Sequence, residues 1–468
     1  MLFPTLTFGL FFLALFALAW IVVQPAEWRK IILLVASWIF YGAWDWRFVT
    51  LLIVSGVLNW GAARAISQTA SPHRRRMLVI AGVTANLTIL IIFKYYGFFF
   101  EQVSAGLQAL GWGRDLPIIQ VILPVGVSFF TFQGMSYLID VYRGKLPAAS
   151  LLHVTLLMSF FAHLIAGPIV RGADLVPQFE KGPQITRGGA ALGVLMIVWG
   201  LFKKSVLASE LATGLVDPVF FDPSAHNAPD LIAATYGYAV QIYADFSAYS
   251  DMAIGLAALL GYRFPRNFDQ PYRAVTLQDF WRRWHISLSS WLRDYLYIPL
   301  GGGRGSVWFV CRNLMITFVL GGLWHGAAWK FAIWGVIHGV VLSIERLWGH
   351  FRPRRLPAAP KWLTLIVTFH VVCLAWIFFR ADDFATAIDF LAGLGRWAPS
   401  TLAVTPMAAA LIAFGLALHA SPPRLIEGVA VRAARMPAWA FGLTAGALIL
   451  FIDALRPEGV QAFIYFRF

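Results

Sequence analysis

Long apolar segments follow one another along almost the whole chain, with short polar or charged stretches between them. These segments cover residues 2–23, 31–43, 48–63, 77–97, 121–139, 151–170, 193–201, 331–347, 362–379, 403–419 and 438–455. A helix that crosses the hydrocarbon core of a bilayer needs about 20 such residues. The pattern therefore predicts an all-α polytopic membrane protein with about eleven transmembrane helices, forming one integral-membrane domain over residues 1–468.

Composition and charge support this class of protein. The chain is 59% hydrophobic, with a mean hydropathy of +0.70. Its net charge of +14 arises because lysines and arginines stand mainly at the ends of the apolar segments. Membrane proteins concentrate such residues on the cytoplasmic side, so the charge predicts topology and gives no reason to expect a nucleic-acid partner.

The first apolar segment predicts the orientation of the chain. Residues 2–23 lack the basic start and the small-residue cleavage site of a signal peptide, so we expect a retained span. The basic residues 29–30 follow it, which places the N-terminus outside and the next loop in the cytoplasm. Basic groups at 73–76, 143–145 and 203–204 continue the alternation.

Residues 231–260 are apolar but interrupted by polar side chains. These are Gln241, Tyr243, Asp245, Ser247, Tyr249, Ser250 and Asp251. A carboxylate within a membrane segment is costly unless it faces protein or a water-filled cavity. We therefore expect Asp245 and Asp251 to line an internal cavity.

A polar region follows between residues 262 and 306, where seven arginines and three aspartates occur. Thr276 and Asp279 have the spacing of a helix N-cap, so we expect a helix to begin near Leu277. On one helix, Gln278, Arg282, His285, Ser289 and Arg293 would form a single polar stripe, with aromatic and apolar residues on the other faces. Such a helix would lie in the membrane interface or dip into the membrane.

Three histidines are candidates for chemistry in this part of the chain. His325 lies in the glycine-rich run 320–326, directly after Trp324, and we expect both side chains to line a cavity. Burial would keep its imidazole neutral at pH 7, as a general base requires, although a packed structural histidine has the same pattern. A turn between His285 and His325 would allow them to face one another, and His338 is a weaker candidate for lining the same cavity.

Four arginines are candidates for binding the phosphates of a charged donor at the cytoplasmic face. They are Arg282, Arg283, Arg293 and Arg304, the last of them within the glycine-rich turn 301–305. This turn lacks the Lys-Ser/Thr of a phosphate-binding loop, so it does not by itself indicate nucleotide binding. Solvated arginines on an interfacial helix would give the same pattern.

Other site types lack support in the sequence. The two cysteines, Cys311 and Cys373, lie in or beside apolar runs and have no partner spacing for zinc. No His-Glu-x-x-His, Cys-x-x-Cys or Gly-x-Ser-x-Gly pattern occurs. We therefore expect no metal site, no bound cofactor and no hydrolase-type serine nucleophile.

Several motifs resemble those of the membrane-bound O-acyltransferase (MBOAT) family, in particular the bacterial branch that O-acetylates alginate. They are residues 164–168 (LIAGP), 243–255 (YADFSAYSDMAIG), 267–272 (NFDQPY), 279–295 (DFWRRWHISLSSWLRDY), 321–326 (GGLWHG) and the aromatic end 463–468. The resemblance covers nearly the whole chain. It implies a ring of membrane helices around a central funnel with re-entrant or interfacial helices, and a core catalytic region at about residues 240–345.

The resemblance also implies a function. An acetyl group would pass from a cytoplasmic donor, acetyl-CoA as co-substrate, across the bacterial inner membrane to an exported polysaccharide. His325 corresponds to the family's catalytic histidine, and His285 to its second important position. The acceptor would be a sugar hydroxyl or a serine on a periplasmic SGNH-type, esterase-like partner, and the resemblance favours the partner.

Two other functions are compatible with the sequence. A related enzyme of the same family would transfer D-alanine or another acyl group to teichoic acid or peptidoglycan. A polysaccharide or ion transporter would also place carboxylates and arginines inside a membrane protein. A transporter would move its substrate without changing it covalently.

Overall fold

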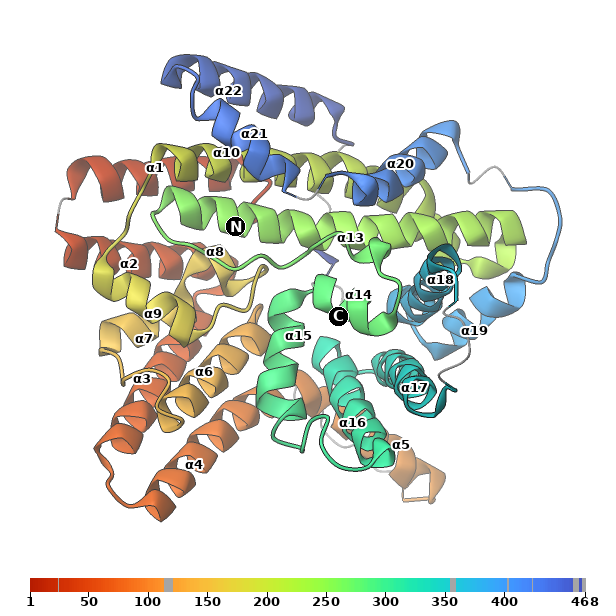
Figure 1. The fold of residues 1–468 in the computed structure, drawn as a ribbon, viewed down its shortest axis with the longest axis horizontal. Coiled ribbons are helices and arrows are strands. Elements are labelled where there is room, and N and C mark those ends of the chain that lie inside the picture. The colour runs from red at the N-terminus through yellow and green to blue at the C-terminus, as the bar shows by residue number, and fades with distance from the viewer. Residues whose placement is uncertain are drawn as a thin grey trace. The chain divides into compact units, whose positions relative to one another are not determined.

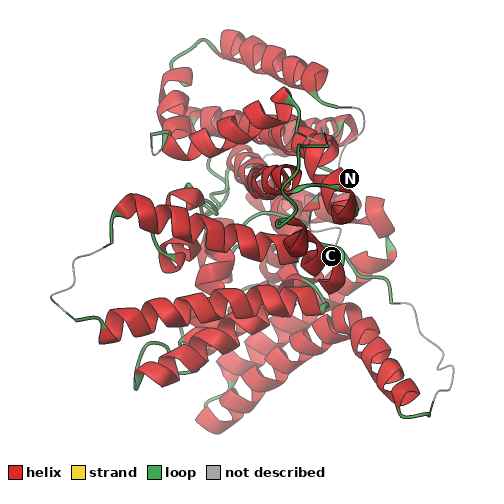
Figure 2. Ribbon diagram, turned by 90° about the vertical axis from the view of Figure 1, so that its right-hand side faces the viewer, coloured by secondary structure: helices red, strands yellow, loops and turns green. Residues whose placement is uncertain are grey.

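The computed structural model describes residues 1–23, 25–112, 121–353, 359–401, 404–422, 424–457 and 463–464. Within these ranges every regular element is a helix and no strand occurs (Figure 2), which confirms the predicted all-α class. The chain forms two compact units, Met1–Gly189 with Leu256–Phe264, and Ala190–Gly255 with Pro265–Phe468. The single integral-membrane domain over residues 1–468 stays a prediction.

In its described residues the first unit holds nine complete α-helices and two π-helical segments that continue α1 and α4. They are α1 (Leu6–Ala17) with Leu18–Val22, α2 (Ala26–Asp45), α3 (Arg47–Gln68), α4 (Pro72–Leu90) with Ile91–Tyr95, α5 (Tyr96–Ala109), α6 (Val127–Tyr142), α7 (Leu151–Ser159), α8 (Phe161–Leu164) and α9 (Gly172–Lys181). Helices α3, α4 and α6 pack side by side (Figure 1), and α7 packs on α3.

The second unit holds the remaining helices. They are α10 (Arg187–Phe202, which begins in the first unit), α11 (Ser209–Leu211), α12 (Asp217–Phe221), α13 (Ala228–Leu259, which ends in the first unit), α14 (Leu277–Arg283), α15 (Ile286–Leu292), α16 (Val307–His325), α17 (Trp329–Phe351), α18 (Lys361–Arg380), α19 (Phe384–Gly393), α20 (Pro406–Ala417), α21 (Leu425–Ala433) and α22 (Ala438–Leu455). Short π- and 3₁₀-helical segments join them at Lys203–Ala208, Ala212–Val216, Pro223–Ala225, Pro271–Arg273, Arg293–Tyr297 and Leu418–Ala420.

Seven helices of the described chain are long and apolar enough to cross a membrane, or eight if the bent pair Pro406–Ala420 and Leu425–Ala433 forms one span. The seven are Arg47–Gln68, Pro72–Ala109, Arg187–Phe221, Val307–His325, Trp329–Phe351, Lys361–Arg380 and Ala438–Leu455. A polytopic membrane protein is therefore confirmed, with fewer such helices than the expected eleven. The difference arises where apolar segments are short or broken, as at Leu6–Val22 and at Phe160 between α7 and α8.

Segment 121–139 also differs from its prediction. The apolar run predicts a span from residue 121, but α6 begins only at Val127. Gly126 precedes it with a φ of 80°, and a Cβ at this position would overlap the carbonyl oxygen of Leu164. Glycine is needed here both for the left-handed backbone and for the close approach.

Buried amides hold α3 against α4. Asn59 Nδ2 donates to Asn86 Oδ1 at 3.3 Å, and Asn86 Nδ2 donates back to Asn59 Oδ1 at 3.0 Å. Gly134 of α6 lies against this pair, where a Cβ would come within 2.6 Å of Asn59 Nδ2. Reciprocal amide bonds of this kind satisfy polar groups that have no water to bind inside a membrane.

Candidate active site

A cavity of about 870 Å³ opens in the second unit among α14, α15, α16 and α17. Its volume falls within the range of small-molecule binding sites. Apolar side chains and glycines make up half of the residues that line it. The polar and charged residues that line it are Thr276, Gln278, Arg282, Ser289, Ser290, Arg293, Tyr297, Thr317, His325, Glu345, Arg346 and His350.

The close packing of α16 on α17 positions His325. A Cβ on Gly322 would overlap the carbonyl oxygen of Phe331, and one on Gly335 would overlap that of Phe318. Glycines therefore let the two backbones approach as in small-residue helix contacts of membrane proteins. His325 is the last residue of α16 and comes to lie beside Trp334 of α17.

Aromatic rings surround the imidazole of His325 on three sides. Its ring centre lies 5.2 Å from Trp324, 5.0 Å from Trp334 and 5.2 Å from Phe379, each in an edge-on arrangement. The residue is only 4% exposed, and what remains exposed faces the cavity. The rings fix the plane of the imidazole while leaving it open to a ligand.

His338 and Trp324 lie behind the cavity wall and are not among its lining residues. Trp334 stands between two histidines, because its ring centre lies 4.6 Å from His338 and 5.0 Å from His325. His338 is fully buried, and its Nδ1 accepts a hydrogen bond from Trp281 Nε1 at 3.3 Å. Neither residue lines this cavity, and His338 instead contacts Trp281 and Trp334 of its wall.

The predicted continuous helix after Leu277 is wrong. Thr276 does cap its start, since Thr276 Oγ1 accepts from the Asp279 amide at 3.0 Å. The helix then breaks at His285, whose φ of 42° and ψ of 55° lie in the left-handed region. A residue other than glycine pays about 1–3 kcal/mol for such a backbone, so the surrounding structure must hold it there.

The break divides the expected polar stripe. Gln278, Arg282, Ser289 and Arg293 all line the cavity, whereas His285 turns into the protein. Its ring packs edge-on against Phe246 at 4.5 Å and lies 6.2 Å from Trp324. In the described part of the chain neither ring nitrogen has a hydrogen-bond partner, and burial lowers the pKa of His285 to about 3. The imidazole is therefore neutral at pH 7.

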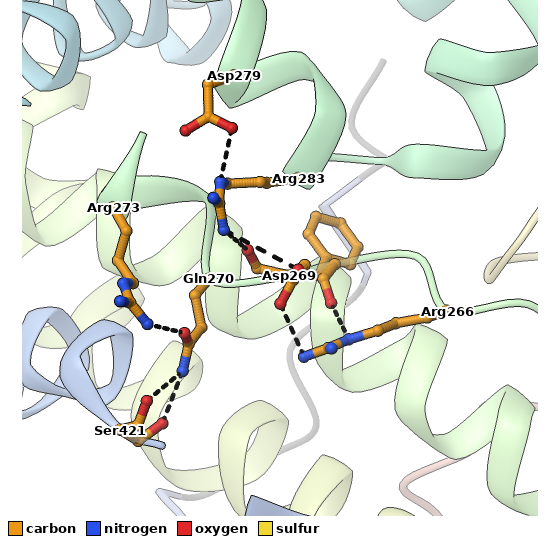
Figure 3. Close-up of polar contacts among 8 residues, drawn as sticks. Arg266, Asp269, Gln270, Arg273, Asp279, Arg283 and Ser421 are labelled. Carbon is orange, nitrogen blue, oxygen red and sulfur yellow. Dashed lines mark hydrogen bonds and ion pairs between the residues drawn. The ribbon is translucent and has the colours of Figure 1, made fainter. Parts of the chain in front are cut away.

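The four predicted arginines separate into two groups. Arg282 and Arg293 line the cavity, and the charge of Arg293 is partly balanced by Asp294, 2.6 Å from its Nε. Arg283 instead pairs with Asp279 at 3.0 Å and Asp269 at 3.9 Å (Figure 3). Arg304 is exposed and does not line the cavity.

Among the charged or titratable cavity residues that sequence reasoning missed, three belong to α17: Glu345, Arg346 and His350. All three lie near the end of α17, where Arg346 and His350 have the i, i+4 spacing of one helix face. We had interpreted this helix end only as the boundary of a span. The i, i+4 spacing of Arg346 and His350 was the sequence signal that could have indicated a polar face on this helix.

Asp245 and Asp251 do not line this cavity, because each is paired with a buried lysine. Asp245 Oδ1 lies 2.9 Å from Lys204 Nζ, and Asp251 Oδ2 lies 2.7 Å from Lys203 Nζ. Both lysines are 2% exposed and lie within the apolar helical stretch Arg187–Phe221. Residues 203–204 therefore lie in a helix and not in a loop, and buried ion pairs balance their charges. Their position on the cytoplasmic side stays a prediction.

The described residues contain no group of three or more His, Cys, Asp or Glu side chains that could hold a metal ion. Cys311 and Cys373 are both buried and free.

Residues 142–381 match the family model of the membrane-bound O-acyltransferases. The chain belongs to this family. The acyltransferase is 40% identical to the "Probable alginate O-acetylase AlgI" of Azotobacter vinelandii over 417 residues, 86% of this chain and 80% of that protein. It is 38% identical to the "Peptidoglycan O-acetyltransferase" of Helicobacter pylori over 72% of this chain and 68% of that protein. It is 28% identical to the "Teichoic acid D-alanyltransferase" of Bacillus subtilis over 56% of this chain and 69% of that protein.

Every residue that lines the cavity of the acyltransferase, from Thr276 to His350, lies inside the matched region. An acyl transfer to a hydroxyl group needs a base beside the reacting atoms and a pocket for the donor. The cavity has His325 in its wall, together with Arg282, Arg293 and Arg346. Family membership thus favours the enzyme over the transporter interpretation.

Proposed function

We propose that this acyltransferase moves an acetyl group from a cytoplasmic thioester, acetyl-CoA, across a bacterial inner membrane for the O-acetylation of an exported polysaccharide such as alginate. The observation that carries the proposal is His325, which lies in the wall of a cavity that Arg282, Arg293 and Arg346 also line. The probable alginate O-acetylase of Azotobacter vinelandii is similar over 86% of this chain. Its name supports acetyl as the transferred group and a polysaccharide as the acceptor.

In the proposed mechanism His325 is the general base. Its neutral imidazole takes the proton of the acceptor hydroxyl as the oxygen attacks the thioester carbonyl. The carbon–oxygen bond forms, the carbon–sulfur bond breaks, and the leaving thiolate recovers the proton from the imidazolium. The three aromatic rings around His325 support this role, because they hold the imidazole in place.

His285 assists in this mechanism by orienting the thioester or stabilising the leaving thiolate. Its neutral state supports the role, since a neutral imidazole can donate one N–H group to an oxygen or sulfur atom. Its lack of a hydrogen-bond partner among the described residues leaves that N–H group available for substrate. The ring of Trp324 links the two histidines, with its centre 6.2 Å from His285 and 5.2 Å from His325.

Arg282, Arg293 and Arg346 would bind the phosphates of acetyl-CoA. Charge-assisted hydrogen bonds from guanidinium groups to phosphate oxygens are among the strongest polar contacts in proteins. The acceptor is a sugar hydroxyl or, as we favour, a serine on a periplasmic SGNH-type partner that completes the transfer. The N-terminus would lie outside and the arginine end of the cavity toward the cytoplasm.

A peptidoglycan acceptor is the second candidate function. The peptidoglycan O-acetyltransferase of Helicobacter pylori is nearly as similar, at 38% identity over 365 residues. The same cavity and histidine would serve both acceptors, because the acyl donor and the bond formed are the same. Transfer of D-alanine is less favoured, since the D-alanyltransferase of Bacillus subtilis is 28% identical over 276 residues.

The test is acetyl transfer from radiolabelled acetyl-CoA by the purified protein in liposomes, with and without an extracytoplasmic fraction of its host. We expect the wild type to label polymer or partner and His325→Ala to lose the label while remaining folded. His153→Ala is the matched control, because it removes another buried imidazole, one that bonds Lys30 in the first unit. Full labelling by His325→Ala would overturn the assignment.

A further inference from the structure

A loop far from His285 in sequence pairs with the backbone on both sides of it. The Asp269 amide donates to the carbonyl oxygen of Arg283 at 2.9 Å, and the Ile286 amide donates to the carbonyl oxygen of Asn267, also at 2.9 Å. His285 lies between these two bonds, at the break between α14 and α15. The loop therefore holds both ends of the left-handed turn.

The side chain of Asn267 adds a second set of bonds. Its Oδ1 accepts from the Ser287 amide at 3.1 Å and from the Ser287 hydroxyl at 2.9 Å. Its Nδ2 donates to Ser250 Oγ of α13 at 3.0 Å. Asn267 is 1% exposed and thus joins α13 to the start of α15 from inside the protein.

These bonds satisfy groups that α15 cannot satisfy itself. The first amides of a helix have no acceptor within the helix. Asn267 supplies an acceptor to two of them, Ile286 through its main chain and Ser287 through its side chain. The left-handed conformation of His285 depends on such outside support.

Ion pairs strengthen the loop itself, as Figure 3 shows. Arg283 reaches Asp269 beside the backbone bond that joins the same two residues, and Arg266 pairs with Asp269 at 3.1 Å.

The next residue of the loop, Gln270, is also held in place. Its backbone is left-handed, with a φ of 48°. Its Nε2 donates to Ser421 Oγ at 2.9 Å and to the Ser421 carbonyl oxygen at 2.8 Å. The loop is therefore a braced element and can fix the position of the residues it contacts.

We propose that Asn267 is the positioning residue for His285 in the acyl-transfer reaction. It holds the backbone of the break so that the imidazole faces Phe246 and Trp324, with its nitrogen atoms kept for substrate. The proposal rests on the function proposed above, in which His285 acts on the thioester. Asn267 itself touches no reacting atom.

The test compares Asn267→Leu with Asn267→Asp in liposomes. Leucine has a similar size and removes both side-chain contacts, whereas aspartate keeps an acceptor for Ser287 and can accept from the Ser250 hydroxyl. A misplacement of about 1 Å can cost about 100-fold in rate, so we expect Asn267→Leu to lower kcat about 100-fold with less than about threefold change in KM for acetyl-CoA. We expect Asn267→Asp to recover kcat to within about tenfold of the wild type.

Two measurements separate positioning from simple destabilisation. Asn59→Leu is the matched control, because it removes an equally buried amide from α3, and its kcat per folded molecule should equal that of the wild type. Amide hydrogen exchange of residues 283–290 should become faster in Asn267→Leu and remain unchanged in Asn59→Leu. The exchange result does not depend on which reaction the enzyme catalyses.

The outcomes distinguish this proposal from the function on which it rests. Loss of activity in His285→Ala together with wild-type kcat in Asn267→Leu would overturn the positioning role alone. A kcat that is equally low in folded Asn267→Leu and Asn267→Asp would also overturn it, since the acceptor oxygen would then be irrelevant. Wild-type activity in His285→Ala would instead overturn the role of His285, whatever the exchange data show.

Discussion

At the scale of single residues, burial and pairing decide which polar side chains are available for chemistry. His325 and Arg346 lie in the cavity wall, while Arg283, Asp245 and Asp251 are neutralised by partners of opposite charge. Residue type alone does not make this distinction. The difference between an arginine in the cavity wall and one outside it leads to a first prediction.

Arg346→Gln should raise KM for acetyl-CoA, whereas Arg304→Gln should leave it unchanged. Arg346 lines the cavity and Arg304 is exposed outside it. A hydrogen bond to a charged group contributes about 1.5–3 kcal/mol, so we expect KM to rise about 10- to 100-fold with kcat nearly unchanged. Steady-state kinetics of both variants check this, and equal effects would contradict a phosphate-binding role for the cavity.

His285 should make stability depend on pH. Burial lowers its pKa from 6.5 to about 3, so between these values the unfolded chain binds a proton that the folded protein does not. The free energy of unfolding has its full value above pH 6.5. Below this pH it falls by about 1.4 kcal/mol for each pH unit, because the unfolded chain binds the proton. Thermal unfolding in detergent at pH 7.5 and pH 5 should show a smaller difference for His285→Gln than for the wild type. An identical difference would mean that His285 is protonated in the folded state.

At the scale of elements, contacts from distant helices shape the short helices around the cavity. Glu345 of α17 caps α14, since its Oε1 accepts from the Leu277 amide at 2.6 Å and its Oε2 from the Gln278 amide at 3.2 Å. Asn267 does the same for α15. Each helix has seven residues, too few to be stable without such support.

Glu345→Ala should therefore lower both stability and kcat. Loss of a cap costs about 0.5–2 kcal/mol, and α14 carries Trp281 and Arg282 of the cavity wall. Asp383→Ala is the matched control, because Asp383 Oδ1 caps α19 through the Thr386 amide at 2.7 Å. We expect a similar loss of thermal stability in both variants and a loss of kcat only in Glu345→Ala. Normal kcat in a folded Glu345→Ala protein would show that α14 needs no cap from α17.

At the scale of the whole molecule, the apolar helices establish a polytopic protein and the basic loops predict its orientation. The corrected position of Lys203 and Lys204 removes one of the supports for that orientation, because they are buried. The loop between α3 and α4, followed by Arg74, Arg75 and Arg76, remains the strongest cytoplasmic marker.

Cysteine labelling tests this topology with little background, since Cys311 and Cys373 are buried. Ala70→Cys, in the loop before α4, should react with a membrane-impermeant maleimide only when the cytoplasmic side is opened. Gln108→Cys, at the end of α5, should react in intact cells. Both positions are exposed. The reverse pattern would invert the predicted orientation of the first unit.

The sequence by itself determined the helical membrane class and the family, and it singled out His325, which the structure places in the cavity wall. These properties depend on local information: the length of apolar runs, the position of basic loops and the unbroken motif 321–326 around His325. The cap at Thr276 was equally local and was correctly predicted. Most of the polar stripe, at Gln278, Arg282, Ser289 and Arg293, was found for the same reason.

Only the tertiary structure decided the break at His285, the Lys–Asp pairs and the contribution of α17 to the cavity. Helical spacing predicted one continuous helix through His285, but bonds from Asn267, 18 residues earlier, stabilise a left-handed turn there instead. Likewise Lys203 and Lys204 could be buried because carboxylates of α13 lie beside them. Local propensity amounts to less than about 1 kcal/mol for most residues, so a few buried polar contacts between distant segments outweigh it.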